Sequence, residues 1–136
     1  MLGLRRRGGG LRGLPWLMLA TVFAAPAPAG AQPEHEIGDL RAAVRKSRCN
    51  FERNGTMFSG PQAAEHLGQK YRRIARGPNA SAEGFIESVG TASSISGSPY
   101  LVHCAGEPAS TSNGWLMSQL RSIRSMRAKA REDRAQ

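Results

Sequence analysis

The residues of this 136-residue chain with types suited to catalysis or metal binding are three histidines and a run of serines. A metal site needs several converging His, Cys or carboxylate ligands. His35 falls in a polar lead, His66 in a helical stretch and His103 on the outward side of a strand, so we predict no metal and no cofactor. A hydrolase needs a nucleophile beside a base. The candidates for that chemistry are His66 and the serine-rich loop 93–98, which lacks a Gly-x-Ser-x-Gly turn.

The N-terminal segment has the order of a secretory signal peptide. Arginines precede a short apolar run, Leu14 to Ala25, and small residues follow up to Ala29-Gly30-Ala31. The run is well short of the roughly 20 residues that span a bilayer, although a retained anchor is the alternative. We expect cleavage after Ala31, a mature chain from Gln32 without a transmembrane span, and a periplasmic or secreted location.

Two cysteines in a small exported protein are typical of one disulfide bond. Cys49 and Cys104 are separated by a long stretch of chain, and no Cys-x-x-Cys motif indicates redox catalysis. The chain-entropy model assigns roughly 4 kcal/mol of stabilisation to a disulfide that closes a loop of this length. We therefore expect a Cys49–Cys104 disulfide.

The net charge of +9 is concentrated at the two ends of the chain. Arginines of the predicted signal account for part of it, and residues 125–136 form a polar, basic C-terminal tail. Such a tail is suited to an acidic partner or to anionic lipid, and a solvated helix end is the simpler explanation. Export argues against nucleic acid as a partner.

Local patterns then predict the elements that position these residues. Ile37, Leu40 and Val44 recur at helical spacing and predict a helix over residues 35–47. Asn54-Gly55 between two short runs predicts a hairpin over residues 49–59 with a type I′ turn. Cys49, Phe51 and Phe58 then share one face of it, with Asn50, Glu52 and Met57 on the other.

Further helix and strand signals follow the hairpin. Ser59 and Gln62 form a capping box for a second helix, which Gly77-Pro78 ends. Ser81 caps a short third helix, residues 100–104 read as a strand, and residues 105–111 read as a loop. Ser112 is expected to cap the last helix.

These elements predict a single α+β domain over residues 32–124. A small antiparallel sheet of about three strands, the hairpin 49–59 plus strand 100–104, is packed by about four helices. On the predicted second helix, His66 and Lys70 lie one turn apart. They are either an exposed or rim-packed pair, or part of a polar recognition spot.

The recognition spot is the functional hypothesis that we attach to specific residues, which come from the hairpin, the second helix, the serine-rich loop and the third strand. Its members are Arg53, His66, Lys70, Ser96 and Tyr100.

Residues spread over the chain have the order and spacing of a known family. They are Cys49-x-Phe51-x-Arg53-Asn54-Gly55, Ala63-x-x-His66-Leu67-x-x-Lys70-Tyr71, Phe85-Ile86, Ser93-Ser94-Ile95-Ser96-Gly97-x-Pro99-Tyr100, Cys104 and Trp115-Leu116. On these residues the chain resembles the YfeK-like family of short exported proteobacterial proteins, a domain of unknown function. The resemblance implies a bacterial envelope protein with this two-cysteine layout, and it implies no activity or catalytic residue. Glu52 and Phe58 depart from the aliphatic residue and the tyrosine usual there.

Three functional hypotheses remain. The first is a small disulfide-bonded, non-catalytic binding module of the bacterial envelope, with an envelope protein or an anionic cell-surface component as its partner. The second is a small periplasmic hydrolase or ligand-binding enzyme that uses His66 and loop 93–98. The third is a structural envelope component whose basic tail contacts lipid.

Overall fold

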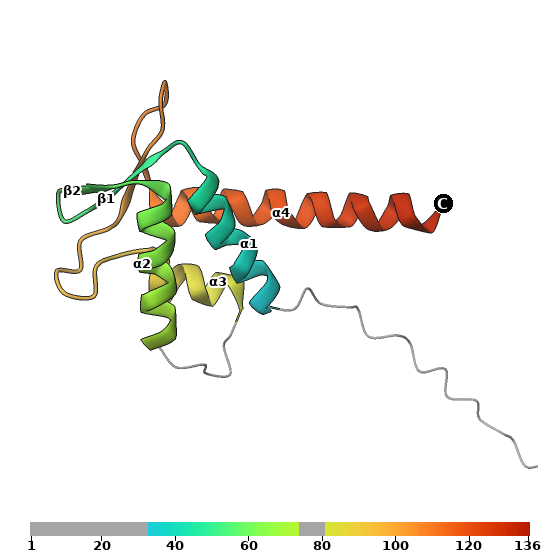
Figure 1. Ribbon diagram of the computed structural model, residues 1–136, viewed down its shortest axis with the longest axis horizontal. Helices are drawn as coiled ribbons and strands as arrows, with labels where there is room; N and C mark the ends of the chain where they lie inside the picture. Colours follow the sequence, from blue (N-terminus) through green and yellow to red (C-terminus); the bar gives the residue numbers. More distant parts are fainter. Residues whose placement is uncertain (1–32, 74–80) are drawn as a thin grey trace, which may run out of the picture.

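Helices and one small antiparallel sheet make up the described part of the protein, residues 33–73 and 81–136 of a computed structural model (Figure 1). In chain order the elements are α1 (Pro33–Lys46), β1 (Asn50–Arg53), β2 (Thr56–Phe58), α2 (Gly60–Arg73), α3 (Ala82–Phe85), the π-helical turn η1 (Ile86–Gly90), β3 (Leu101–His103), β4 (Ser110–Thr111) and α4 (Ser112–Ala135). The predicted α+β class is confirmed. The predicted signal peptide and the Gly77-Pro78 helix end lie outside the described residues.

The sheet has the strand order β2-β1-β3-β4, with every pairing antiparallel. Phe51 faces Phe58 on one side and Val102 on the other, so the predicted hairpin register is confirmed. The turn residues Asn54 and Gly55 have φ values of 50° and 76°, as a type I′ turn requires. The prediction of about three strands was one short, because residues 110–111 return to pair with β3.

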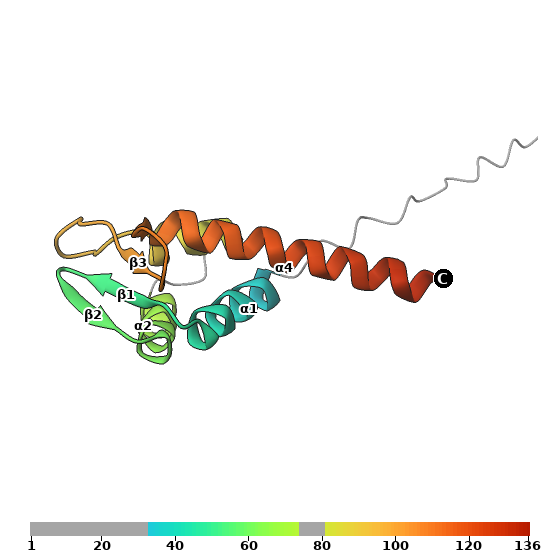
Figure 2. The same ribbon diagram turned by 90° about the horizontal axis from the view of Figure 1, so that it is seen from above.

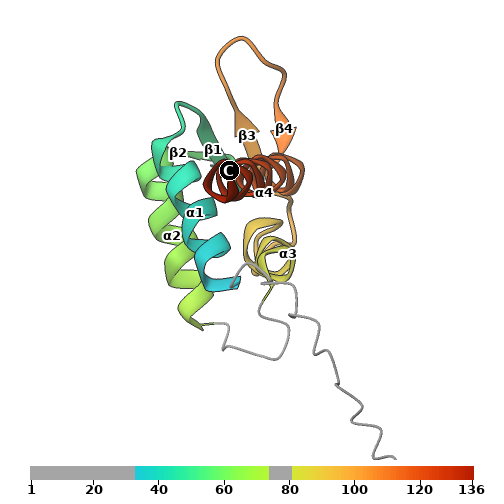
Figure 3. The same ribbon diagram turned by 90° about the vertical axis from the view of Figure 1, so that its right-hand side faces the viewer.

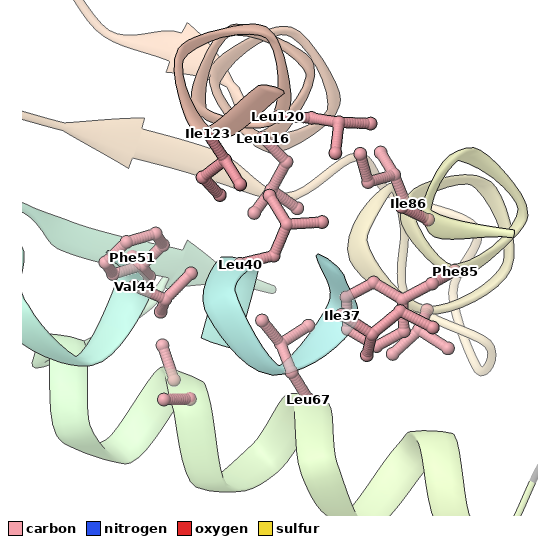
Figure 4. Close-up of a cluster of buried hydrophobic side chains, with 14 of the residues drawn as sticks. Ile37, Leu40, Val44, Phe51, Leu67, Phe85, Ile86, Leu116, Leu120 and Ile123 are labelled. Carbon is pink, nitrogen blue, oxygen red and sulfur yellow. The ribbon is translucent and has the colours of Figure 1, made fainter. Parts of the chain in front are cut away.

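Apolar side chains from the inner face of the sheet and from all the helices form one core (Figure 4). Leu40 is completely buried between α2 and α4, Leu116 points toward it from α4, and Leu120 lies beside Ile86. The ring of Trp115 packs edge-on against Phe51, with 5.5 Å between ring centroids. The helical spacing read from the sequence therefore identifies the buried faces of α1 and α4.

Side-chain caps begin two helices where the sequence indicates them. The main-chain N–H of Ser59 donates to Gln62 Oε1, and that of Gln62 donates back to Ser59 Oγ, which confirms the capping box. Ser81 Oγ accepts from the N–H of Gly84 and caps α3. The prediction for α4 was wrong by one residue. Thr111 Oγ1 accepts from Gly114 and is the cap, because Ser112 is already helical and buried.

The disulfide Cys49–Cys104 joins the two central strands of the sheet. Cys49 directly precedes β1 and Cys104 directly follows β3, next to the paired residues Asn50 and His103. Antiparallel pairing brings these two ends together, which is why cysteines 55 residues apart in sequence meet.

An ion-pair cluster holds α1, α3 and α4 together. Arg124 donates from Nε and Nη2 to the two oxygens of Glu36, both at 2.8 Å, and also pairs with Glu83 of α3. The hydrogen bonds from Arg124 are the largest cause of the lowered pKa of Glu36. Residues 32–36 were expected to be a flexible polar lead, yet α1 begins at Pro33 and the Glu36 carboxylate is buried.

Helix α4 lies along the longest axis of the molecule, and its C-terminal part extends past the other helices (Figures 1 and 2). Seen end-on, α1 and α2 lie to the left of α4 and α3 lies below it (Figure 3). The basic tail predicted for residues 125–136 is thus helical up to Ala135. No helix in the part of the chain that the structure describes is long and apolar enough to cross a membrane.

Candidate functional site

A small pocket lies between the β1–β2 hairpin and α2. Its volume is about 40 Å³, and its lining combines apolar walls with polar side chains. The lining residues are Phe51, Glu52, Arg53, Phe58, Ala63, His66, Leu67 and Tyr100. Three members of the predicted recognition spot, Arg53 of β1, His66 of α2 and Tyr100 just before β3, therefore meet at one place.

Arg53 and His66 are in direct contact at the pocket. Arg53 Nη1 lies 2.9 Å from His66 Nε2. A guanidinium group only donates, so Nε2 is the acceptor and the imidazole is neutral, with its proton on Nδ1. Burial and then the charges of Arg53, Lys70 and Arg73 lower the pKa of His66, which keeps it neutral at pH 7.

Lys70 is one turn further along α2 and connects this helix to η1 and to the segment after it. Its Nζ donates to the carbonyl oxygens of Val89 and Ala92, at 3.3 and 2.8 Å, and lies 5.3 Å from the ring centroid of Tyr100. Burial and the charge of Arg53 lower the pKa of Lys70. Because its ammonium group already binds two carbonyls, Lys70 positions Tyr100 more than it offers a free charge.

Loop 93–98 is held against the hairpin turn by Asn54 (Figures 1 and 2 show the two loops at the same end of the molecule). Asn54 Nδ2 donates to the Oγ of Ser93, and Ser96 Oγ donates to Asn54 Oδ1 at 2.6 Å. The buried Ser93 Oγ also accepts the main-chain N–H groups of Ile95 and Ser96. These serines therefore serve the loop's own structure.

The structure does not pair a serine with a histidine in the way that the hydrolase hypothesis requires. His66 Nε2 accepts from Arg53, and Ser96 binds Asn54. His103 hydrogen-bonds Glu52 at 2.7 Å on the outer face of the sheet, away from the core as the strand alternation indicated. Within residues 33–73 and 81–136, no three His, Cys, Asp or Glu side chains are placed to hold a metal ion.

Two hydrogen-bonding groups at the pocket are buried without a partner in the described structure, Arg53 Nε and the hydroxyl of Tyr100. Neither cation of the site forms an ion pair with a described carboxylate, and residues 1–32 and 74–80 contain no Asp or Glu. Burial raises the pKa of Tyr100, while the charge of Arg53 opposes the rise. At the pocket, Arg53 is therefore a cation without a direct ion pair among the described residues, and the carboxylate of the lining, Glu52, pairs with His103 instead.

Sequence reasoning found most of this site but missed the role of Asn54. The Asn-Gly pair indicated the turn. The hydrogen bonds of the Asn54 side-chain amide to Ser93 and Ser96, 39 and 42 residues away, could not be predicted from any local sequence pattern. It also placed Ser96 in the spot with Arg53 and Tyr100. The structure instead places it on the hairpin turn, exposed and outside the pocket lining.

The fold and the pocket define a small disulfide-bonded α+β protein with a cationic cluster beside an apolar hollow. By sequence the chain belongs to the Family of unknown function (DUF5329), whose profile matches residues 31–124. No curated protein and no solved structure matches the chain. The expected domain of unknown function is thereby confirmed, while the YfeK-like name and the proteobacterial origin stay predictions.

Proposed function

We propose that this protein is an exported, non-catalytic binding module of the bacterial envelope, which contacts an envelope protein or an anionic cell-surface component. The observation that carries the proposal is the cluster of Arg53, His66 and Tyr100 at one pocket, where Arg53 forms no ion pair with a carboxylate of the described residues. Arg53 is half-buried, and a partly desolvated cation without an ion pair gains from a partner of opposite charge. The pocket is thus suited to recognition.

Export is supported by the N-terminal segment and by the disulfide. Basic residues, an apolar run and Ala29-Gly30-Ala31 follow the order of a cleavable signal, and structural disulfides persist in oxidising compartments. Cell fractionation with mass spectrometry of the purified protein tests this. We expect an N-terminus at Gln32 in the periplasmic or secreted fraction, and full-length protein in the cytoplasm would contradict it.

The contacts of the polar residues favour binding over turnover. A histidine that acts as a general base needs its unprotonated nitrogen facing the proton it takes. In His66 that nitrogen faces Arg53, a permanently protonated donor. The enzyme hypothesis would require this contact to break before any proton transfer.

The lipid-contacting tail has less support than the pocket. Among the basic residues of the C-terminal part of α4, Arg127 already pairs with Asp39 of α1. Glu132 and Asp133 offset part of the remaining charge. The tail hypothesis predicts salt-sensitive binding of the protein to anionic vesicles that is lost on truncation after Arg124.

Site-specific photocrosslinking in intact cells tests the binding function. Gln69 is exposed and lines an open hollow that also includes His66 and Phe58, so a photoreactive p-benzoylphenylalanine at this position samples the neighbourhood of the pocket. Lys129, exposed on the distal part of α4, is the matched control position. We expect a discrete ultraviolet-dependent adduct from position 69 and none from position 129.

The outcomes separate the hypotheses. Recovery of free monomer alone from position 69 would count against a binding module. An adduct from position 129 and not from position 69 would move the contact surface to α4. If the adduct from position 69 disappears in Arg53→Lys, the partner contacts the cationic pocket, because lysine keeps the positive charge and lacks the planar guanidinium group.

A further inference from the structure

The two unpartnered donors are on Arg53 and Tyr100, which both line the pocket, and their chemistry indicates what it accepts. Arg53 Nε–H can only donate, and the Tyr100 hydroxyl, on a residue that is 7% exposed, is a good donor at neutral pH. Leaving a buried donor unpaired is costly, so two on residues of one pocket indicate a ligand acceptor.

The guanidinium group of Arg53 is oriented for a bidentate contact. His66 accepts from Nη1, and Nε–H is directed along a different edge of the same planar group. The Nε edge of arginine binds both oxygens of a carboxylate through parallel N–H···O bonds. His66 is a positioning residue here, because its contact fixes the plane in which Arg53 presents that edge.

The size and walls of the pocket restrict the ligand further. About 40 Å³ is far below the roughly 300–1,000 Å³ of pockets that enclose whole small molecules. It has room for one small planar group. Phe51, Phe58 and Leu67 contribute apolar walls, which suit a monoanion on an apolar stem and disfavour a strongly hydrated dianion such as phosphate. The lining also includes Glu52, whose carboxylate is held by His103 on the outer face of the sheet.

We propose that Arg53 and Tyr100 bind a carboxylate group carried on a short apolar stem, with the stem against Phe58. The open hollow that shares Phe58 and His66 with the pocket receives the rest of the ligand. The same chemistry is offered by a free short-chain carboxylate and by the C-terminus of a polypeptide. This inference rests on the proposed binding function and names the group that is recognised.

Nuclear magnetic resonance of the full protein labelled with ¹⁵N tests the site directly through the Arg53 Nε–H resonance. The probes are butyrate and its neutral counterpart butyramide, inorganic phosphate, and a tripeptide ending in alanine as the free acid and as the amide. We expect butyrate and the free-acid tripeptide to shift the Arg53 Nε–H signal downfield, and the neutral probes and phosphate to leave it unchanged. The tighter binder of the first two identifies the source.

Two conservative variants keep the test independent of folding. Tyr100→Phe removes only the hydroxyl, and its matched control is Tyr71→Phe, which alters a partly buried tyrosine of α2 that stacks edge-on against Phe85. Losing a hydrogen bond to a charged ligand weakens binding by about tenfold. We expect that loss for Tyr100→Phe and Arg53→Lys, and an unchanged affinity for Tyr71→Phe.

Several results would overturn the proposal. An Arg53 Nε–H signal that does not respond to butyrate at about 0.1 M, a concentration at which millimolar binding saturates, would show that water alone satisfies the donors. Equal responses to butyrate and butyramide, or to phosphate, would remove the carboxylate specificity. If the photocrosslinked partner persists in either case, the binding function stands and only the carboxylate site falls.

Discussion

Removing the Arg124 side-chain charge is expected to destabilise the protein through Glu36. The Glu36 side chain is 4% exposed and receives two hydrogen bonds from Arg124, whose own side chain is 46% exposed. Breaking a buried ion pair by removing one partner costs roughly 3–5 kcal/mol. Because water reaches Arg124, we reduce that figure and expect Arg124→Met to lose about 2 kcal/mol of unfolding free energy.

The loss should depend on pH in a defined direction. In the native protein, the Arg124 hydrogen bonds lower the pKa of Glu36 below its value in the unfolded chain. The contribution of the pair to the free energy of unfolding is therefore complete above the unfolded-state pKa, and it is lost as the pH falls through the lower folded-state pKa. In Arg124→Met the buried carboxylate has no partner, and protonation relieves it. The difference between the two proteins should therefore shrink between pH 7 and pH 3.

Urea unfolding followed by far-ultraviolet circular dichroism measures these free energies. Arg121→Met is the matched control, because Arg121 is an exposed arginine one turn earlier on α4 and should change stability by less than about 0.5 kcal/mol. Adding Glu36→Gln to Arg124→Met should restore stability, since a neutral amide is cheaper to bury. Equal losses for Arg124→Met and Arg121→Met, or a gap that widens on acidification, would refute the reasoning.

Three further predictions concern the disulfide, a close approach of two helices and a histidine. Without reductant, a thiol reagent should label neither Cys49 nor Cys104 in the denatured protein, and labelling of both would disprove the disulfide in solution. Reduction should lower the free energy of unfolding by about 4 kcal/mol. Gly60→Ala places Cβ 2.5 Å from a main-chain oxygen of α1 and should lower the urea midpoint, while Gly38→Ala, with open space, should raise it. The lowered pKa of His66 means that stability falls as pH drops below about 6.5, and His66→Gln should remove that slope in acid titrations.

The hairpin and the helix starts were predictable because each has a local cause. The Asn54-Gly55 turn adopts positive φ at both positions, and the Ser59 and Ser81 caps bond to residues three positions away. Thr111 was missed in favour of its neighbour Ser112. Both residue types cap helices, and only the return of β4 to β3 decides where α4 begins.

The candidate site was predictable in its members more than in its contacts. The turn, the helix and the strand placed Arg53, His66 and Tyr100 on separate elements, and hairpin packing on α2 brought them to one pocket. The contact of Arg53 with His66 and the burial of Tyr100 depend on that packing. Ser96 was assigned to the same spot, but the Asn54 amide draws it to the hairpin tip.

Sequence alone determined the fold class, the hairpin register, the inward faces of the helices and the placement of Cys49 and Cys104 on the core side of the sheet. These features follow from periodicity and from turn chemistry acting over a few residues. Tertiary structure decided the fourth strand, the Glu36–Arg124 pair across 88 residues, and the unpartnered donors at the Arg53 pocket. Such features depend on how distant elements pack, because burial and charge pairing are set by neighbours that only the folded chain supplies.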